Sequence, residues 1–131
     1  MIKNLKNKKK KKAFTLIELI IVIAIIAILA SIALPKFGQI RQNANSKADL
    51  ANAKTIANAV SALVSDEKIG MTVTKFELNP SATSGDAYDI KEYLQSIPTP
   101  KSETGNFWVE VVGGNAKIYI GSTTSTLIYP N

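Results

Sequence analysis

A long apolar stretch near the N-terminus constrains this chain more than any other feature of its sequence. Residues 14–34 read FTLIELIIVIAIIAILASIAL, and only Thr15, Glu18 and Ser31 interrupt the apolar side chains. As an α-helix this stretch would be about 30 Å long, which matches the hydrocarbon core of a bilayer. The sequence therefore predicts one membrane-spanning helix.

Charge is distributed unevenly along the chain. Seven of the 16 basic residues (Lys3, Lys6 and Lys8 to Lys12) lie in the first twelve positions, whereas all ten acidic residues lie at Glu18 or later. From residue 14 onward, 9 basic and 10 acidic residues give a net charge of −1. The basic leader is expected to stay in the cytoplasm, which places the C-terminus outside. The rest of the chain has no electrostatic reason to bind nucleic acid.

Glu18 argues against two simpler interpretations of this apolar stretch, a secretory signal peptide and an ordinary membrane anchor. A secretory signal peptide has an apolar region of about 7–15 residues, shorter than this one, and has no use for a carboxylate. An ordinary anchor helix explains the length and the lysines but not Glu18, because a membrane-embedded carboxylate costs up to about 3 kcal/mol and usually marks a function. We expect the segment itself to offer Glu18 no partner.

Residues 12–19, KAFTLIEL, follow a lysine-rich leader and resemble the processing site of type IV prepilins. The resemblance implies that a membrane peptidase cuts the Ala13–Phe14 bond, removes residues 1–13 and N-methylates Phe14. The family usually has Gly before the cut, and this chain has Ala13 there. Alanine adds only one methyl group, so we expect cleavage to proceed.

The resemblance also implies roles for Glu18 and Pro35. Glu18 would form an assembly salt bridge with the Phe14 amine of a neighbouring subunit and so set its register, because an unpaired charge in apolar surroundings is costly. Apolar helix faces exchange lipid for protein contacts at little cost, so such a subunit could leave the bilayer for a filament. Pro35 would kink the helix, since it lacks an N–H; alternatively, it ends the helix.

A helical pattern resumes after Pro35 and extends the predicted helix over 15–69, with Gly70 as its C-terminal stop. Residues 36–69 form its amphipathic half, and one side of that half must be covered. The apolar side would hold Ile40, Ala44, Ala48, Ala51, Ile56, Val60, Leu63 and Val64. The polar side would hold Gln42, Lys47, Asp49, Asn52, Lys54 and Asn58.

Residues 70–131 are predicted to form a globular head that covers this half-helix. Residues 71–84 suggest a loop that includes one short strand at 72–76. Asp89 and Glu92 have capping-box spacing and would open a short helix that ends at Gln95. Strands 107–112 and 116–120 flank a glycine-rich turn, and 126–129 offers a third strand. The predicted fold class is α+β, with a long bent N-terminal helix packed on an antiparallel sheet of about three strands.

The composition excludes several kinds of site. The chain has no cysteine and no histidine, which excludes disulfides, a thiolate nucleophile and ordinary zinc sites. We predict no enzymatic activity, no cofactor and no metal.

Asp86, Asp89 and Glu92 could alternatively bind calcium, but acids at a helix start are favoured by the helix dipole. The aromatic residues Phe107, Trp108, Tyr119 and Tyr129 could alternatively stack on bases, although core and strand positions explain them.

These features together predict a structural subunit of a type IV pilus. The expected partners are other copies of the chain, the prepilin peptidase and methyltransferase, the membrane assembly machinery and, before assembly, membrane lipid. The expected location is the cell membrane and then the surface filament. A pseudopilin of a secretion or competence apparatus, and an uncleaved membrane-tethered binding module, are the alternatives.

Overall fold

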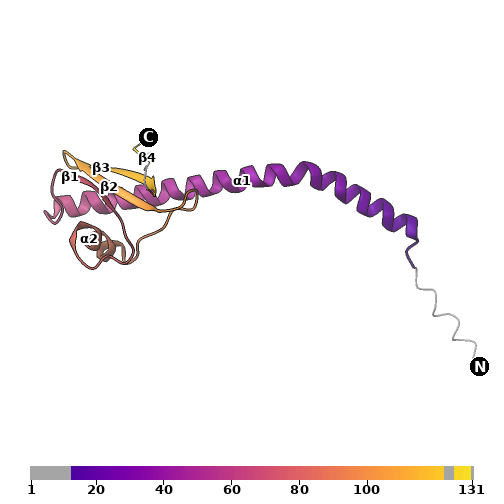
Figure 1. Ribbon diagram of the computed structural model, residues 1–131, viewed down its shortest axis with the longest axis horizontal. Coiled ribbons are helices and arrows are strands. Elements are labelled where there is room, and N and C mark those ends of the chain that lie inside the picture. The colour runs from indigo at the N-terminus through magenta and orange to yellow at the C-terminus, as the bar shows by residue number, and fades with distance from the viewer. Residues whose placement is uncertain (1–12, 123–125, 131) are drawn as a thin grey trace, which may run out of the picture. The chain divides into compact units, whose positions relative to one another are not determined.

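The computed structural model describes residues 13–122 and 126–130, so most of the leader at 1–13 lies outside the described residues. The chain separates into two units, Met1–Ile40 and Arg41–Asn131. The first unit holds the N-terminal part of helix α1 (Leu16–Ser65). The second unit, the head, holds the rest of α1, helix α2 (Gly85–Leu94) and four strands (Figure 1). The α+β fold is confirmed.

The long helix α1 continues through Pro35 and ends at Ser65. The alternative that Pro35 ends the helix is therefore wrong, whereas the kink stays a prediction. The predicted stop at Gly70 is also wrong. Lys68 N–H donates to the Leu63 carbonyl at 2.9 Å, and Glu67, at φ 61°, donates to Val64 at 3.0 Å. This is a Schellman cap with a left-handed glutamate where glycine is usual.

A four-stranded antiparallel sheet in the order β1-β2-β3-β4 forms the other layer of the head. Its strands are β1 (Val73–Glu77), β2 (Asn106–Val112), β3 (Asn115–Gly121) and β4 (Thr126–Tyr129). The predicted hairpin is confirmed, with Gly113 and Gly114 at φ 58° and 83° in its two-residue turn. Glycine adopts both angles without strain, which suits a two-residue hairpin turn. The predicted strand at 72–76 is β1, so the sheet has four strands where about three were expected.

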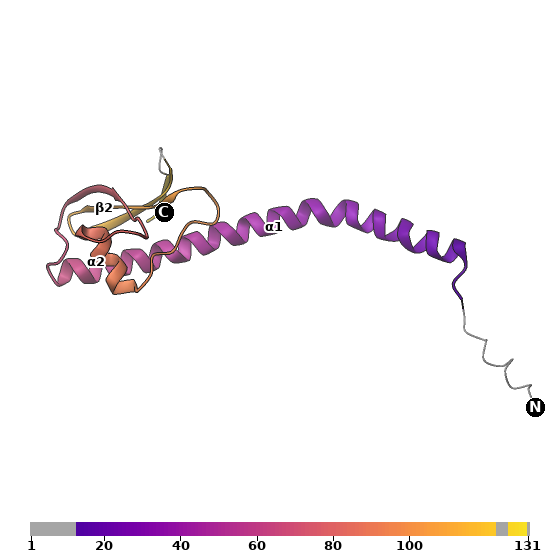
Figure 2. The same ribbon diagram turned by 60° about the horizontal axis from the view of Figure 1, so that its bottom comes forward.

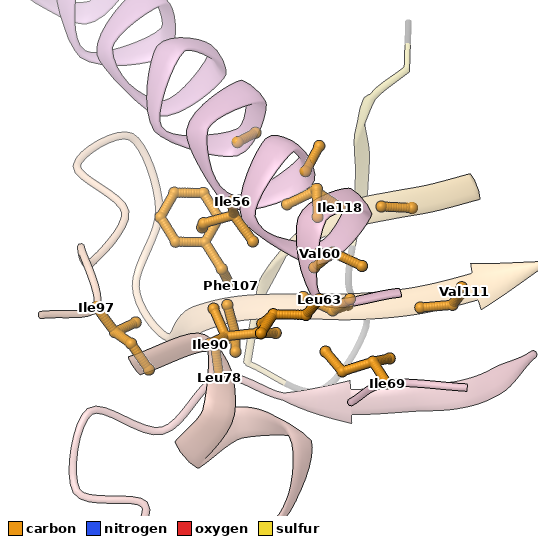
Figure 3. Close-up of a cluster of buried hydrophobic side chains, with 14 of the residues drawn as sticks. Ile56, Val60, Leu63, Ile69, Leu78, Ile90, Ile97, Phe107, Val111 and Ile118 are labelled. Atoms are coloured by element: carbon orange, nitrogen blue, oxygen red, sulfur yellow. The ribbon is translucent and has the colours of Figure 1, made fainter. Parts of the chain in front are cut away.

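The core lies where the sheet and α2 cover the C-terminal half of α1 (Figures 1 and 2). Phe107, fully buried in β2, lies among Ile56 and Val60 of α1 and Ile90 of α2 (Figure 3). The buried side of α1 begins only at Asp49, while Ile40, Ala44 and Ala51 are exposed. The predicted apolar side was therefore too long, since Ile40 and Ala44 lie before the buried part of α1 and Ala51 faces away from the core.

The N-cap of helix α2 lies five residues earlier than predicted, at Ser84 and not at Asp89. Ser84 is in extended conformation, and Asp86 lies in the first turn, where the helix dipole favours an acid. Asp89 therefore lies inside the helix, and the predicted capping box at Asp89 and Glu92 is wrong. The helix ends at Leu94, with Gln95 in left-handed conformation at φ 70°.

Candidate processing and assembly segment

The bond between Ala13 and Phe14 lies just outside α1. Ala13, Phe14 and Thr15 have no regular secondary structure, and the Phe14 side chain is 87% exposed. A peptide bond inside a helix is hydrogen-bonded to its own chain, whereas this one precedes the first helical turn. The backbone at the predicted cleavage site is therefore accessible to a peptidase.

Thr15 and Glu18 cap the start of α1 reciprocally. The Thr15 N–H donates to Glu18 Oε2 at 2.9 Å, and the Glu18 N–H donates to Thr15 Oγ1 at 3.2 Å. This capping box satisfies two backbone donors that the first turn would otherwise leave unpaired. The expectation that the segment offers Glu18 no partner is therefore wrong. The box uses one carboxylate oxygen, and Glu18 keeps a second oxygen for another donor.

The first unit carries its apolar side chains on the outside. No residue of the most apolar 18-residue window of α1 is buried, and the mean hydropathy of that window is 3.0. The exposed apolar residues extend past Pro35 to Phe37 and Ile40, which are 66% and 63% exposed. By length and composition, α1 can cross a membrane. This surface fits membrane anchoring, because an apolar face of this size is unstable in water.

Ser31, the last of the three polar residues within the apolar stretch, has its hydrogen bond inside the helix. Its hydroxyl donates to the Ile28 carbonyl at 2.7 Å. With Ser31 bonded in this way and Glu18 bonded to Thr15, both polar groups have partners within their own helix. In an apolar environment the Ser31 hydroxyl therefore keeps an acceptor, and one oxygen of the Glu18 carboxylate keeps a donor.

Asp49 is a residue that the sequence placed on the wrong side of the helix. It is 1% exposed, and its carboxylate accepts the Lys101 N–H at 2.7 Å and the Ser102 N–H at 2.8 Å. The Ser102 hydroxyl also donates to Asp49. This carboxylate ties the loop between α2 and β2 to α1. It lies more than 50 residues from its partners in the sequence, and no local pattern indicates the pairing.

The four aromatic residues considered for base stacking do not share a surface. Phe107 is buried in the core, whereas Trp108 and Tyr119 are cross-strand partners on the outer face of the sheet. The Lys75 ammonium lies 3.8 Å from the centre of the Tyr119 ring. The Tyr119 hydroxyl donates to Glu110 at 2.8 Å, and this hydrogen bond, with burial and the nearby Glu110 charge, raises the pKa of Tyr119. Strand packing and these local contacts explain the outer aromatic pair.

The acidic residues of α2 form no metal site. Within residues 13–122 and 126–130, no group of three or more His, Cys, Asp or Glu side chains is placed to hold a metal ion. Asp86 has a raised pKa, caused first by burial and then by the nearby charge of Asp89.

Comparison with known proteins identifies the N-terminal segment. Residues 8–34 match the family model of the prokaryotic N-terminal methylation motif, the class III signal of type IV pilins. No curated protein and no solved structure matches the chain. The motif supports a type IV pilin-like or pseudopilin precursor, and its family is structural and not enzymatic. The matched residues include Ala13, Phe14 and Glu18.

Proposed function

We propose that this chain is the precursor of a structural type IV pilus subunit. A membrane peptidase would cut it after Ala13 and methylate the new Phe14 amine. The mature chain would then leave the bilayer and polymerise through its N-terminal helix into a surface filament. The observation that carries the proposal is an accessible Ala13–Phe14 bond directly before an exposed apolar helix, within the methylation motif.

In this proposal Glu18 gains a second partner during assembly. In the precursor its carboxylate is bonded to the Thr15 N–H. Cleavage creates a cationic amine on Phe14, and the second carboxylate oxygen is then available to that amine on a neighbouring copy. Charge-assisted hydrogen bonds are roughly twice as strong as neutral ones, and more so away from water. The pairing would favour one register of the incoming subunit.

Two substitutions at Glu18 remove its charge, one with the cap kept and one with the cap lost. Glu18→Gln keeps an oxygen that accepts the Thr15 N–H, so the cap survives while the charge is lost. Glu18→Ala loses both. We expect both variants to be cleaved and both to give few filaments, measured as sheared protein per cell. Normal filament yield from both variants would contradict the proposed pairing with Phe14.

A pseudopilin is the second candidate, because the motif supports both kinds of precursor. Filaments sheared from the surface of the producing cells distinguish the two. If this chain is the main species of those filaments, it is a pilin. If long surface filaments are absent, and the cleaved chain is instead needed for secretion or DNA uptake, it is a pseudopilin.

A further inference from the structure

The sulfur chemistry of this chain is confined to its methionines. The sequence holds two methionines, Met1 and Met71, and no cysteine. Met1 belongs to the leader that the proposed processing removes, so Met71 would carry the one sulfur atom of the mature chain. Oxidation of a methionine thioether to the sulfoxide is a common reaction of exposed methionines. Whether Met71 is open to an oxidant therefore decides where this chemistry can occur in the head.

Met71 is open to solvent in the connection between α1 and β1. The residue is 60% exposed, more than Tyr93, Val112 or Leu127 of the same unit. A dissolved small molecule such as hydrogen peroxide can therefore reach its side chain.

The Met71 thioether also packs against the turn of the β2–β3 hairpin. A Cβ placed on Gly114 would lie 3.2 Å from the Met71 Sδ and 3.1 Å from its Cε, so the thioether lies directly over this glycine. The same Cβ would lie 4.0 Å from Cγ1 of Val64, near the end of α1. The thioether therefore occupies the space that a side chain at position 114 would need, and it joins three segments that are separate in the sequence.

A backbone hydrogen bond joins the same two residues. The Gly114 N–H donates to the Met71 carbonyl at 2.8 Å. Met71 thus holds the hairpin turn both through its carbonyl and through its thioether. The apolar contact keeps the two segments together and so favours the hydrogen bond beside it.

We propose that Met71 is an oxidation site, and that its conversion to the sulfoxide releases the hairpin turn from the α1–β1 connection. Hydrogen peroxide transfers one oxygen atom to Sδ. The sulfur loses two electrons, the O–O bond of the peroxide breaks, and its second oxygen leaves as water with both protons. The apolar thioether becomes a polar sulfoxide, which is more stable in water than against the apolar surface of Gly114 and Val64. The contact weakens, and the hydrogen bond from Gly114 opens more often.

Hydrogen exchange of the Gly114 amide measures this release. The uncut, nitrogen-15-labelled chain in detergent is treated with hydrogen peroxide, and mass spectrometry identifies the peptide that gains one oxygen atom. NMR then compares amide exchange before and after treatment. We expect exchange at Gly114 to be roughly fivefold faster after oxidation, the effect of losing one typical hydrogen bond. The Ser102 amide, bonded to Asp49 about four helical turns before Val64, is the control and should not change.

Two variants assign the effect to the thioether. Met71→Leu keeps an apolar side chain of similar volume that peroxide does not oxidise, so peroxide should leave exchange at Gly114 unchanged. Met71→Gln places a polar group of similar length over Gly114. Without any peroxide, this variant should exchange at Gly114 as fast as the oxidised parent.

Two outcomes would overturn the proposal. The first is a Met71 peptide that stays unmodified while free methionine in the same solution is oxidised. The second is a sulfoxide at Met71 that leaves exchange at Gly114 unchanged, or accelerates Gly114 and Ser102 equally. Because the uncut chain is used, failure of cleavage or of filament formation would disprove the proposed function without affecting this result.

Discussion

The two units of this chain use apolar side chains in opposite ways. In the unit that ends at Ile40, the large apolar residues are exposed, and the described polar groups of Glu18 and Ser31 are bonded within their own helix. In the head, the large apolar residues of α1, α2 and the sheet form one core around Phe107. The first unit therefore depends on lipid or protein partners for burial, whereas the head supplies its own.

The largest effect is expected from Phe107→Ala in the head. Phe107 is fully buried, and removing its ring leaves a cavity, so the free energy of unfolding should fall by roughly 3–5 kcal/mol. Denaturant unfolding followed by Trp108 fluorescence measures it. Val112→Ala is the control, because the Val112 side chain is 46% exposed and the variant keeps the Trp108 probe. An equally small change in both variants would contradict the assigned core.

A smaller but still large loss is expected from Asp49→Ala. The variant leaves the N–H groups of Lys101 and Ser102 without their acceptor, and each buried unpaired group costs about 1–3 kcal/mol. Ser102→Ala removes only the hydroxyl contact and should cost about 1 kcal/mol. The same unfolding assay compares them. If Asp49→Ala is no more destabilising than Ser102→Ala, the carboxylate does not hold the loop.

A gain in stability is expected from Glu67→Gly. Glu67 has a left-handed φ of 61° at the end of α1, which glycine adopts without a steric penalty. The unfolding free energy should rise by up to about 1 kcal/mol, since the relief of strain is partly offset by the greater freedom of the unfolded chain. Gly70→Ala, where a methyl group meets only ordinary contacts, should change little. A loss of stability in Glu67→Gly would mean that the glutamate side chain itself stabilises the cap.

The smallest effect is expected from Ile25→Ala in the first unit. Ile25 is 51% exposed and has no part in the core, so the unfolding free energy of the head in detergent should stay within about 0.5 kcal/mol of the parent. This result, beside the large loss in Phe107→Ala, would sharpen the contrast between the units. Destabilisation of the head comparable to Phe107→Ala would remove that contrast.

Periodicity and turn composition predicted much of this fold, because those signals are local. The apolar span, the glycine turn at Gly113 and Gly114, and strands β2 to β4 follow from patterns within ten or twenty residues. The capping box of Thr15 and Glu18 also has the recognisable Thr-x-x-Glu spacing. Here the residues that decide the structure are neighbours in the chain.

The errors occur where tertiary contacts override local preference. Burial of Ile69, which is 2% exposed, accompanies an early end of α1, and Glu67 takes the left-handed position that Gly70 was expected to mark. Asp49 follows the polar side of the helix in sequence, but the backbone of a distant loop draws its carboxylate inward. Of the candidate site, cleavage at Ala13, methylation of Phe14 and the Glu18 pairing remain predictions, since each involves a second molecule.

The most direct test of the central claim is an intact mass with N-terminal sequencing, made on protein sheared from the producing cells. The account predicts an abundant chain that begins at Phe14 and carries one added methyl group on its amine. A chain that still begins at Met1 and is found only in membranes would contradict it and would favour the membrane-tethered binding module.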